Sequence, residues 1–180
     1  MDEATIQAAT LPVKRTETHI YFFGYEGPDP EACFQQWYPS IFVDKDLSGS
    51  PRFPTSEHYM MYRKALLFGD KITAVGILNA KTPGKAKELG RKAGPFDQPR
   101  WDSSCDAIVE QGNFLKFSQN PKLRAVLLDT GHKIIVEASP SDRIWGIGFD
   151  AEHAVGKEDE WGKNKLGEAL MRVRERLSEQ

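Results

Sequence analysis

The chain has 180 residues and a formal net charge of -2 at pH 7, with 39% hydrophobic and 28% charged residues. This length suits one domain with one sizeable core, and the composition excludes a disordered chain or a protein that coats nucleic acid. No stretch approaches the roughly 18 apolar residues of a membrane helix, and the first ten residues lack the pattern of a signal peptide. We therefore expect an intracellular protein, cytoplasmic or nuclear, with no membrane partner.

The N-terminal part predicts a tail, a strand, a hairpin and a helix. Residues 1–17 are small, polar and aperiodic, which predicts a disordered tail before a domain at 18–180. The apolar run 20–23 predicts a buried strand, and residues 41–53 predict a hairpin around turn-forming Asp, Gly and Pro. The hydroxyl and acidic residues that begin the range 55–68 predict a capped helix.

Three helices are predicted next. The first covers 85–91 and is ended by glycine and proline at 94–95. A loop then leads to Trp101, and hydroxyl and acidic residues offer caps for a longer helix over 102–120. A short amphipathic helix follows at 123–131.

The C-terminal part predicts one strand and one helix. The β-branched run 134–136 is the clearest strand signal in the chain. An irregular segment at 139–148 and an acidic loop at 149–160 follow it. Asn164 is expected to cap the last helix, whose apolar stripe lies within 166–177.

Neither cysteine nor histidine residues show metal-ligand spacing. Cys33 and Cys105 lie far apart and fit two buried reduced thiols better than a disulfide framework. The four histidines match no zinc motif. We therefore expect no metal and no cofactor.

Glu57 and Lys64 lie seven residues apart, so on a helix they share one face. Their heads would be roughly 10 Å apart along the axis, which is too far for a simple ion pair but suits two groups that reach one ribose-sized ligand. A solvated helix face has the same pattern. Both interpretations stay open.

Lys87 and Arg91 lie at i and i+4, so both cations project from one side of their helix. A phosphate between them would relieve their repulsion. Gly90 would let a ligand or another backbone approach closely. The alternative is again an exposed charged face.

The segment 139–148 contains Asp142 and Trp145 directly after the best strand, where loops often present functional groups. These residues suggest a planar group stacked beside a carboxylate, although a turn aspartate and a core tryptophan would fit equally. The segment 162–167 opens the last helix with two lysines and is a candidate anion site, although it matches neither the Walker pattern nor the dinucleotide fingerprint.

Seven short motifs follow one another over about residues 20–177. They are Trp37-Tyr38-Pro39-Ser40, Ser56-Glu57-His58-Tyr59, Lys87-x-x-Gly90-Arg91, Arg100-Trp101, Lys116-Phe117, Asp142-x-x-Trp145-Gly146 and Gly162-x-Asn164-x-Leu166-Gly167. In order and spacing the chain resembles the NADAR family of YbiA-like N-glycosidases.

This resemblance implies a compact, mostly helical α+β fold with a small sheet, and an enzyme that hydrolyses ribosyl N-glycosides. The substrate classes linked to the family are phosphoribosylamino-pyrimidine intermediates of riboflavin synthesis and ADP-ribose attached to guanine in DNA. Active-site roles are implied for Glu57, Trp101, Asp142 and Trp145, and ligand contacts for Lys64, Lys87, Arg91 and Asn164. Gly90, Gly146 and Gly162 belong to the same motifs and are expected to line the substrate site. The loop 149–160 and the tail depart from the family pattern and leave the exact substrate open.

Two mechanisms are compatible with these residues. Asp142 or Glu57 could stabilise an oxocarbenium-like centre or activate water, while Trp145 or Trp101 stacks on the leaving base. Alternatively, Lys64 could form a Schiff base with the ring-opened ribose while Glu57 moves protons. Either mechanism requires the side chains to converge in one cleft.

We expect ADP-ribosyl substrates, including ADP-ribosylated DNA, because Lys87, Arg91 and the helix start at Asn164 offer room for two phosphates. The alternatives are a phosphoribosyl small molecule, hydrolysis of NAD, or a module that binds ADP-ribose or NAD without turnover.

Overall fold

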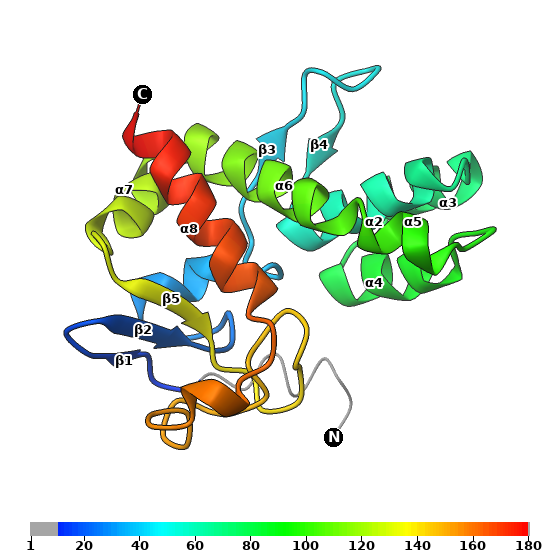
Figure 1. The fold of residues 1–180 in the computed structure, drawn as a ribbon. Helices are drawn as coiled ribbons and strands as arrows, with labels where there is room; N and C mark the ends of the chain where they lie inside the picture. The colour runs from blue at the N-terminus through cyan, green and yellow to red at the C-terminus, as the bar shows by residue number, and fades with distance from the viewer. Residues whose placement is uncertain (1–10, 180) are drawn as a thin grey trace. The chain divides into compact units, whose positions relative to one another are not determined.

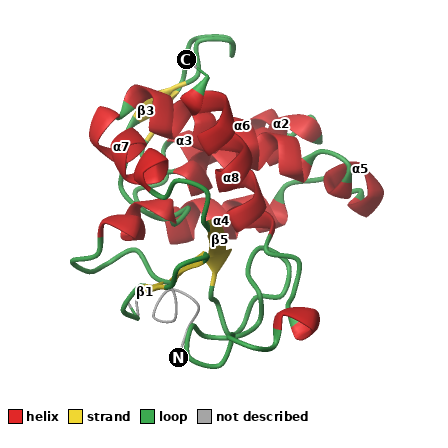
Figure 2. Ribbon diagram, turned by 60° about the vertical axis from the view of Figure 1, so that its left-hand side comes forward, coloured by secondary structure: helices red, strands yellow, loops and turns green. Residues whose placement is uncertain are grey.

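The computed structural model describes residues 11–179, and the chain divides into two units. The terminal unit comprises the described residues of 11–38 and 121–179, and the central unit comprises 39–120. The α+β class is confirmed, with more helix than strand (Figure 2).

The terminal unit is built on a small mixed sheet. Its elements are β1 (Lys14–Arg15), β2 (His19–Phe22), η1 (Pro30–Phe34), α7 (Pro121–Asp129), β5 (Ile134–Glu137), η2 (Glu158–Glu160) and α8 (Lys165–Ser178). The strand order is β1-β2-β5, with β1 antiparallel and β5 parallel to β2. Helix α8 packs on β5, and α7 packs on α8 (Figure 1). The apolar runs predicted as strands at 20–23 and 134–136 are therefore neighbours in one sheet.

The acidic loop that follows Ile147 packs by its small apolar residues. Ala151 and Ala154 join Tyr21 and Val136 in one buried cluster. Trp161 packs against this cluster, and its Nε1 donates to the carbonyl oxygen of Ala154 at 3.0 Å. The small apolar residues of this loop therefore form part of the core of the terminal unit, although the loop is rich in acidic residues.

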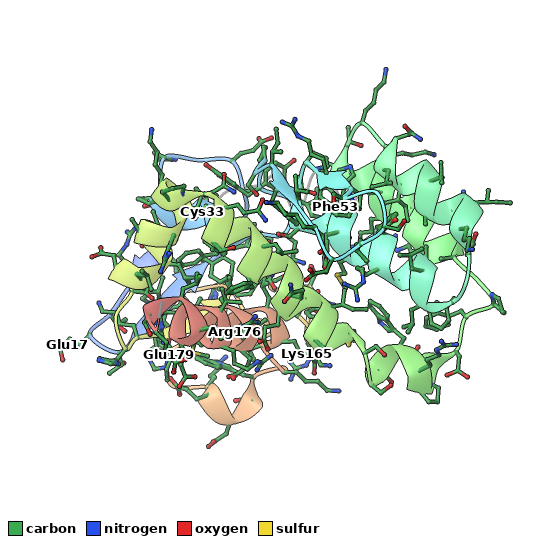
Figure 3. The ribbon with its side chains drawn as sticks, turned by 90° about the horizontal axis from the view of Figure 1, so that it is seen from above. Glu17, Cys33, Phe53, Lys165, Arg176 and Glu179 are labelled. Carbon is green, nitrogen blue, oxygen red and sulfur yellow. The ribbon has the colours of Figure 1, made fainter. Side chains whose placement is uncertain are left out.

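The central unit is a helical group joined to a hairpin. Its elements are β3 (Phe42–Val43), β4 (Arg52–Phe53), α2 (Ser56–Leu67), α3 (Lys71–Leu78), α4 (Pro83–Lys92), α5 (Gln98–Asp102) and α6 (Cys105–Gln119). Helix α2 packs against α3, α4 and α6, and is therefore the centre of this unit (Figure 1). Phe53, labelled in Figure 3, lies with Phe42 and Tyr59 in an aromatic cluster with ring centroids 5.0–5.9 Å apart.

Side-chain caps explain where the helices of the central unit begin. Thr55 accepts from the backbone N–H of His58 at the start of α2, and Asp70 and Thr82 cap α3 and α4 in the same way. The sequence prediction of a capped helix at 55–68 is confirmed, as are the hairpin at 41–53 and the helix around 85–91. Because α2 is capped and covered by three helices, its side chains are held in fixed positions.

Several sequence predictions were wrong in detail. Within the predicted tail, Lys14–Arg15 forms a strand, because Arg15 is held by ion pairs to Asp29 and Glu31; residues 1–10 lie outside the described residues. No helix was predicted at 71–78, where α3 lies, and α5 begins within a segment that was predicted as a loop.

No helix within residues 11–179 is long and apolar enough to cross a membrane. In the same residues, no group of three or more His, Cys, Asp or Glu side chains could hold a metal ion.

Candidate active site

Lys64 is the centre of a cluster of predicted site residues in the central unit. Its Nζ lies 5.4 Å from the centroid of the Trp101 ring and 4.8 Å from that of Phe96. The charge of Arg91 lowers the pKa of Lys64, and the charge of Glu57 raises it. Helix α2 supplies Glu57 and Lys64, α4 supplies Arg91, and α5 supplies Trp101. The structure thus brings four predicted residues together, and adds Phe96, which the sequence did not single out.

The pKa of Lys64 lies below the ordinary value of a lysine. Partial burial is the main cause, because the charged ammonium loses hydration there, and the positive charge of Arg91 acts in the same direction. Glu57 opposes both by stabilising the ammonium. A lowered pKa increases the fraction of neutral amine near neutral pH, which is the form that can attack an electrophilic carbon.

Glu57 is a buried carboxylate in the first turn of α2. The residue is 5% exposed, and charged groups are rarely buried to this extent on an ordinary solvated helix face. The interpretation of Glu57 and Lys64 as a solvated face is therefore wrong.

Helix α4 approaches α2 closely because residue 90 is glycine. A Cβ at Gly90 would overlap the side chain of Met61, so this glycine serves helix packing and not the approach of a ligand. The close packing places α4, with Lys87 half-buried and Arg91 exposed, beside α2. The prediction that Lys87 and Arg91 hold a phosphate stays a prediction.

A buried network ties α2 to the β3–β4 hairpin. Tyr59 donates its hydroxyl to the Asp44 carboxylate at 3.0 Å, and Arg63 donates to the Tyr59 hydroxyl at 2.6 Å. Burial and the Asp44 charge raise the pKa of Tyr59, so this hydroxyl keeps its proton. This network was not predicted from the sequence, where the aromatic and charged residues at 59 and 63, one helical turn apart, are its local signal.

In the terminal unit, Asp142 shapes a turn. Its Oδ1 accepts from the backbone N–H groups of Ile144 at 2.8 Å and Trp145 at 2.9 Å. A Cβ at Gly146 would lie 2.8 Å from the Glu137 carbonyl oxygen, so only glycine fits this turn against β5. The turn interpretation of Asp142 is confirmed, and its catalytic role stays a prediction.

The turn around Trp145 is fastened to the start of α8. The backbone N–H groups of Gly162, Lys163, Asn164, Lys165 and Leu166 donate to carbonyl oxygens of residues 143–147 at 2.8–3.2 Å. The predicted anion site at the helix start is wrong in this respect, because those N–H groups are already used. A Cβ at Gly162 would overlap the backbone of Arg143, which explains the glycine as a packing residue.

Asn164 serves the fold with its whole amide group. Its Oδ1 accepts from the N–H of Glu137 at 3.0 Å, and its Nδ2 donates to the carbonyl oxygen of Ile135 at 2.9 Å. The residue is 7% exposed and adopts a left-handed conformation with φ 47°. The predicted side-chain cap is wrong, because this amide anchors α8 to β5.

Trp145 keeps a position suited to stacking. The indole is half-buried, and the Nζ of Lys165, labelled in Figure 3 at the start of α8, lies 5.8 Å from its centroid. A cation over a ring face is attracted to the ring electrostatically, so Lys165 brings a positive charge close to the Trp145 ring. Stacking of a substrate on this ring stays a prediction.

Known proteins resemble this chain in sequence and in fold. The solution structure of the Escherichia coli protein YbiA superimposes with a TM-score of 0.72 and 28% identity, and covers 96% of this chain and 92% of that one. N-glycosidase R617 of Acanthamoeba polyphaga mimivirus is 45% identical over 165 residues, or 89% of this chain and 96% of that protein. Protein irg-1 of Caenorhabditis elegans is 38% identical, covering 92% and 83%. N-glycosidase YbiA of Escherichia coli K12 is 35% identical, covering 70% and 71%.

These similarities define an enzyme of the N-glycosidase class, a hydrolase that acts on N-glycosyl bonds. The model of the NADAR domain matches residues 21–178, and the chain belongs to the NADAR family. The resemblance found from the motifs of the sequence is thereby confirmed.

Proposed function

We propose that this protein hydrolyses the bond between C1 of ribose and a base nitrogen in ADP-ribosyl substrates, such as ADP-ribosylated guanine in DNA. The observation that carries the proposal is the Lys64 cluster. The amine of a half-buried lysine with a lowered pKa lies near two aromatic rings, and a buried carboxylate acts on its charge. Perturbed titratable groups of this kind are typical of catalytic sites.

Lys64 is the nucleophile in this proposal. When the ribose ring opens, the C1–O4 bond breaks, O4 takes up a proton, and C1 becomes the carbon of an iminium group formed with the base nitrogen. The neutral Nζ of Lys64 adds to C1, the base nitrogen takes up a proton and leaves, and Lys64 remains joined to C1 as an imine. Water then adds to C1 and releases the aldehyde form of the sugar and the free amine. One water is consumed for each base released.

Glu57 moves the protons in this sequence. Once the neutral Nζ has added to C1, it carries an extra proton; the Glu57 carboxylate can accept that proton and return one to the departing base. The rings of Phe96 and Trp101 lie 4.8 Å and 5.4 Å from the Lys64 amine, and its partial burial favours the neutral form. The roles that the family resemblance implies for Asp142 and Trp145, in the terminal unit, stay predictions.

The ADP-ribosyl class is favoured by the cations of α4. Lys87 and Arg91 project from one side of the helix, and a diphosphate would bring two negative groups to them. The start of α8 does not support a second phosphate site, because the backbone N–H groups of residues 162–166 donate to carbonyl oxygens of the chain. The pair on α4 therefore carries the choice of substrate.

Product analysis tests the proposal. The wild-type protein is incubated with an ADP-ribosylated guanine oligonucleotide, a phosphoribosylamino-pyrimidine and NAD in parallel, and the products are separated by chromatography. We expect release of unmodified guanine DNA and free ADP-ribose. Turnover of the pyrimidine or of NAD alone would refute the substrate assignment, and tight ADP-ribose binding without any turnover would refute the reaction.

A matched pair of variants tests the site. Glu57→Gln keeps the shape of the side chain and removes its charge, and should lower kcat about 10²- to 10⁴-fold. Glu88→Gln, which removes an exposed carboxylate on α4, is the control and should keep the wild-type rate. Equal rates in the two variants would remove Glu57 from the mechanism.

A further inference from the structure

The first turn of α2 holds a polar atom that the fold leaves unused. Ser56 is 1% exposed, and its Oγ has no hydrogen-bond partner among the described residues. The neighbouring hydroxyl of Thr55 is used, because it accepts from the N–H of His58 and contacts the His58 ring at 2.8 Å. Buried polar atoms are nearly always paired, so an unpaired one calls for a partner that the free chain does not supply.

Two features of this turn restrict what the partner can be. Side chains on a helix lean toward its N-terminus, so the Ser56 hydroxyl lies toward the start of α2, and the buried Glu57 is the next residue of the same turn. The carboxylate of Glu57 only accepts hydrogen bonds and repels anions, which disfavours a phosphate. A hydroxyl group fits, since it can donate to Glu57 and accept from Ser56.

We propose that Ser56 is a substrate-binding residue whose Oγ donates a hydrogen bond to a hydroxyl-type oxygen, either a ribose hydroxyl or the attacking water, held beside Glu57. This inference rests on the proposed ribosyl hydrolysis and adds a residue to its site. The Ser56 hydroxyl is already buried in the free protein, so the free-energy cost of removing its hydration is part of the folding free energy. Binding of the ligand oxygen therefore adds no further desolvation cost for this hydroxyl.

Unfolding of the free protein gives the first test, which does not depend on activity. Ser56→Ala should leave Tm unchanged or raise it, because an unpaired buried hydroxyl is replaced by an apolar group. Thr130→Val is the control: the Thr130 hydroxyl donates to the Leu127 carbonyl oxygen at 2.6 Å and accepts from Arg174 at 2.8 Å, so its removal should lower Tm. A fall in Tm of Ser56→Ala equal to that of the control would overturn the proposal, since it would reveal a structural partner.

Kinetics give the second test and separate the two oxygen sources. Ser56→Ala should lower kcat/KM about three- to tenfold, the usual effect of one neutral hydrogen bond, and Ser56→Thr, which keeps the hydroxyl, should recover part of this loss. If the ligand oxygen is a ribose hydroxyl, KM rises and the variant no longer distinguishes the substrate from its deoxyribosyl analogue. If it is water, kcat falls and that discrimination is kept.

Wild-type rates in Ser56→Ala would overturn the role of Ser56 while leaving the proposed function intact. A wild-type enzyme that releases no base from any ribosyl substrate would instead overturn the proposed function. The Tm comparison then still decides whether the Ser56 hydroxyl has a structural partner.

Discussion

Replacement of Asn164 by alanine should destabilise the protein strongly, although the family resemblance implies a ligand contact at this residue. The change removes the partners of two backbone groups of β5, the N–H of Glu137 and the carbonyl oxygen of Ile135. Each buried backbone group left unpaired costs about 1–3 kcal/mol. The left-handed backbone at φ 47° adds about 1 kcal/mol for alanine.

We therefore expect Asn164→Ala to lower the free energy of unfolding by about 3 kcal/mol or more. For a chain of this size, such a loss lowers Tm by roughly 6–12 °C. Thermal unfolding followed by circular dichroism measures it. Asn164→Gly is the matched variant: it loses the same amide but tolerates the positive φ, so it should be about 1 kcal/mol more stable than the alanine variant. An alanine variant with wild-type Tm and a raised KM would refute the reasoning and restore Asn164 as a ligand contact.

Three further changes test the central unit. Arg91→Gln removes a charge that lowers the pKa of Lys64, so this pKa should rise and the acidic limb of the kcat/KM profile should move to higher pH; an unmoved limb would exclude Lys64 as the titrating nucleophile. Gly90→Ala should cost about 1–3 kcal/mol in urea unfolding by overpacking against Met61, and a double-mutant cycle with Met61→Ala should show coupling. Tyr59→Phe should lower the free energy of unfolding by about 1–3 kcal/mol because its buried carboxylate partner loses a donor; an unchanged urea midpoint would contradict the network.

The sequence predicted those parts of the fold that local rules decide. Helix α2 was found because a hydroxyl cap and an acidic first turn mark its start, and β5 because three β-branched residues follow one another. Helix α3 was missed because its residues are mostly apolar without a helical period, and Ile72 and Val75 remain exposed, at 89% and 58%. Helix α3 is stabilised by its packing against α2 and α4, and contacts of this kind between separate elements cannot be read from a short stretch of sequence.

The sequence identified several residues of the candidate site but did not establish the role of each. Glu57 and Lys64 could be paired by helical spacing, whereas the association of Lys64 with Arg91 and Phe96 depends on contacts between separate elements. For Asn164 the side-chain cap was wrong and the ligand contact stays a prediction, because an asparagine that binds a ligand and one that bonds to a neighbouring strand have the same sequence signal. For Gly90 the sequence left open whether a ligand or another part of the chain approaches it, and the structure shows the Met61 side chain there.

The central claim is that the amine of Lys64 reacts with C1 of the ribose. Borohydride is added while the wild-type enzyme turns over an ADP-ribosylated guanine oligonucleotide, and peptides are then analysed by mass spectrometry. We predict one reduced ADP-ribosyl adduct on Lys64, no adduct in Lys64→Met, and loss of turnover in that variant. Full turnover by Lys64→Met, or an active wild-type enzyme that never forms an adduct on Lys64, would contradict the account.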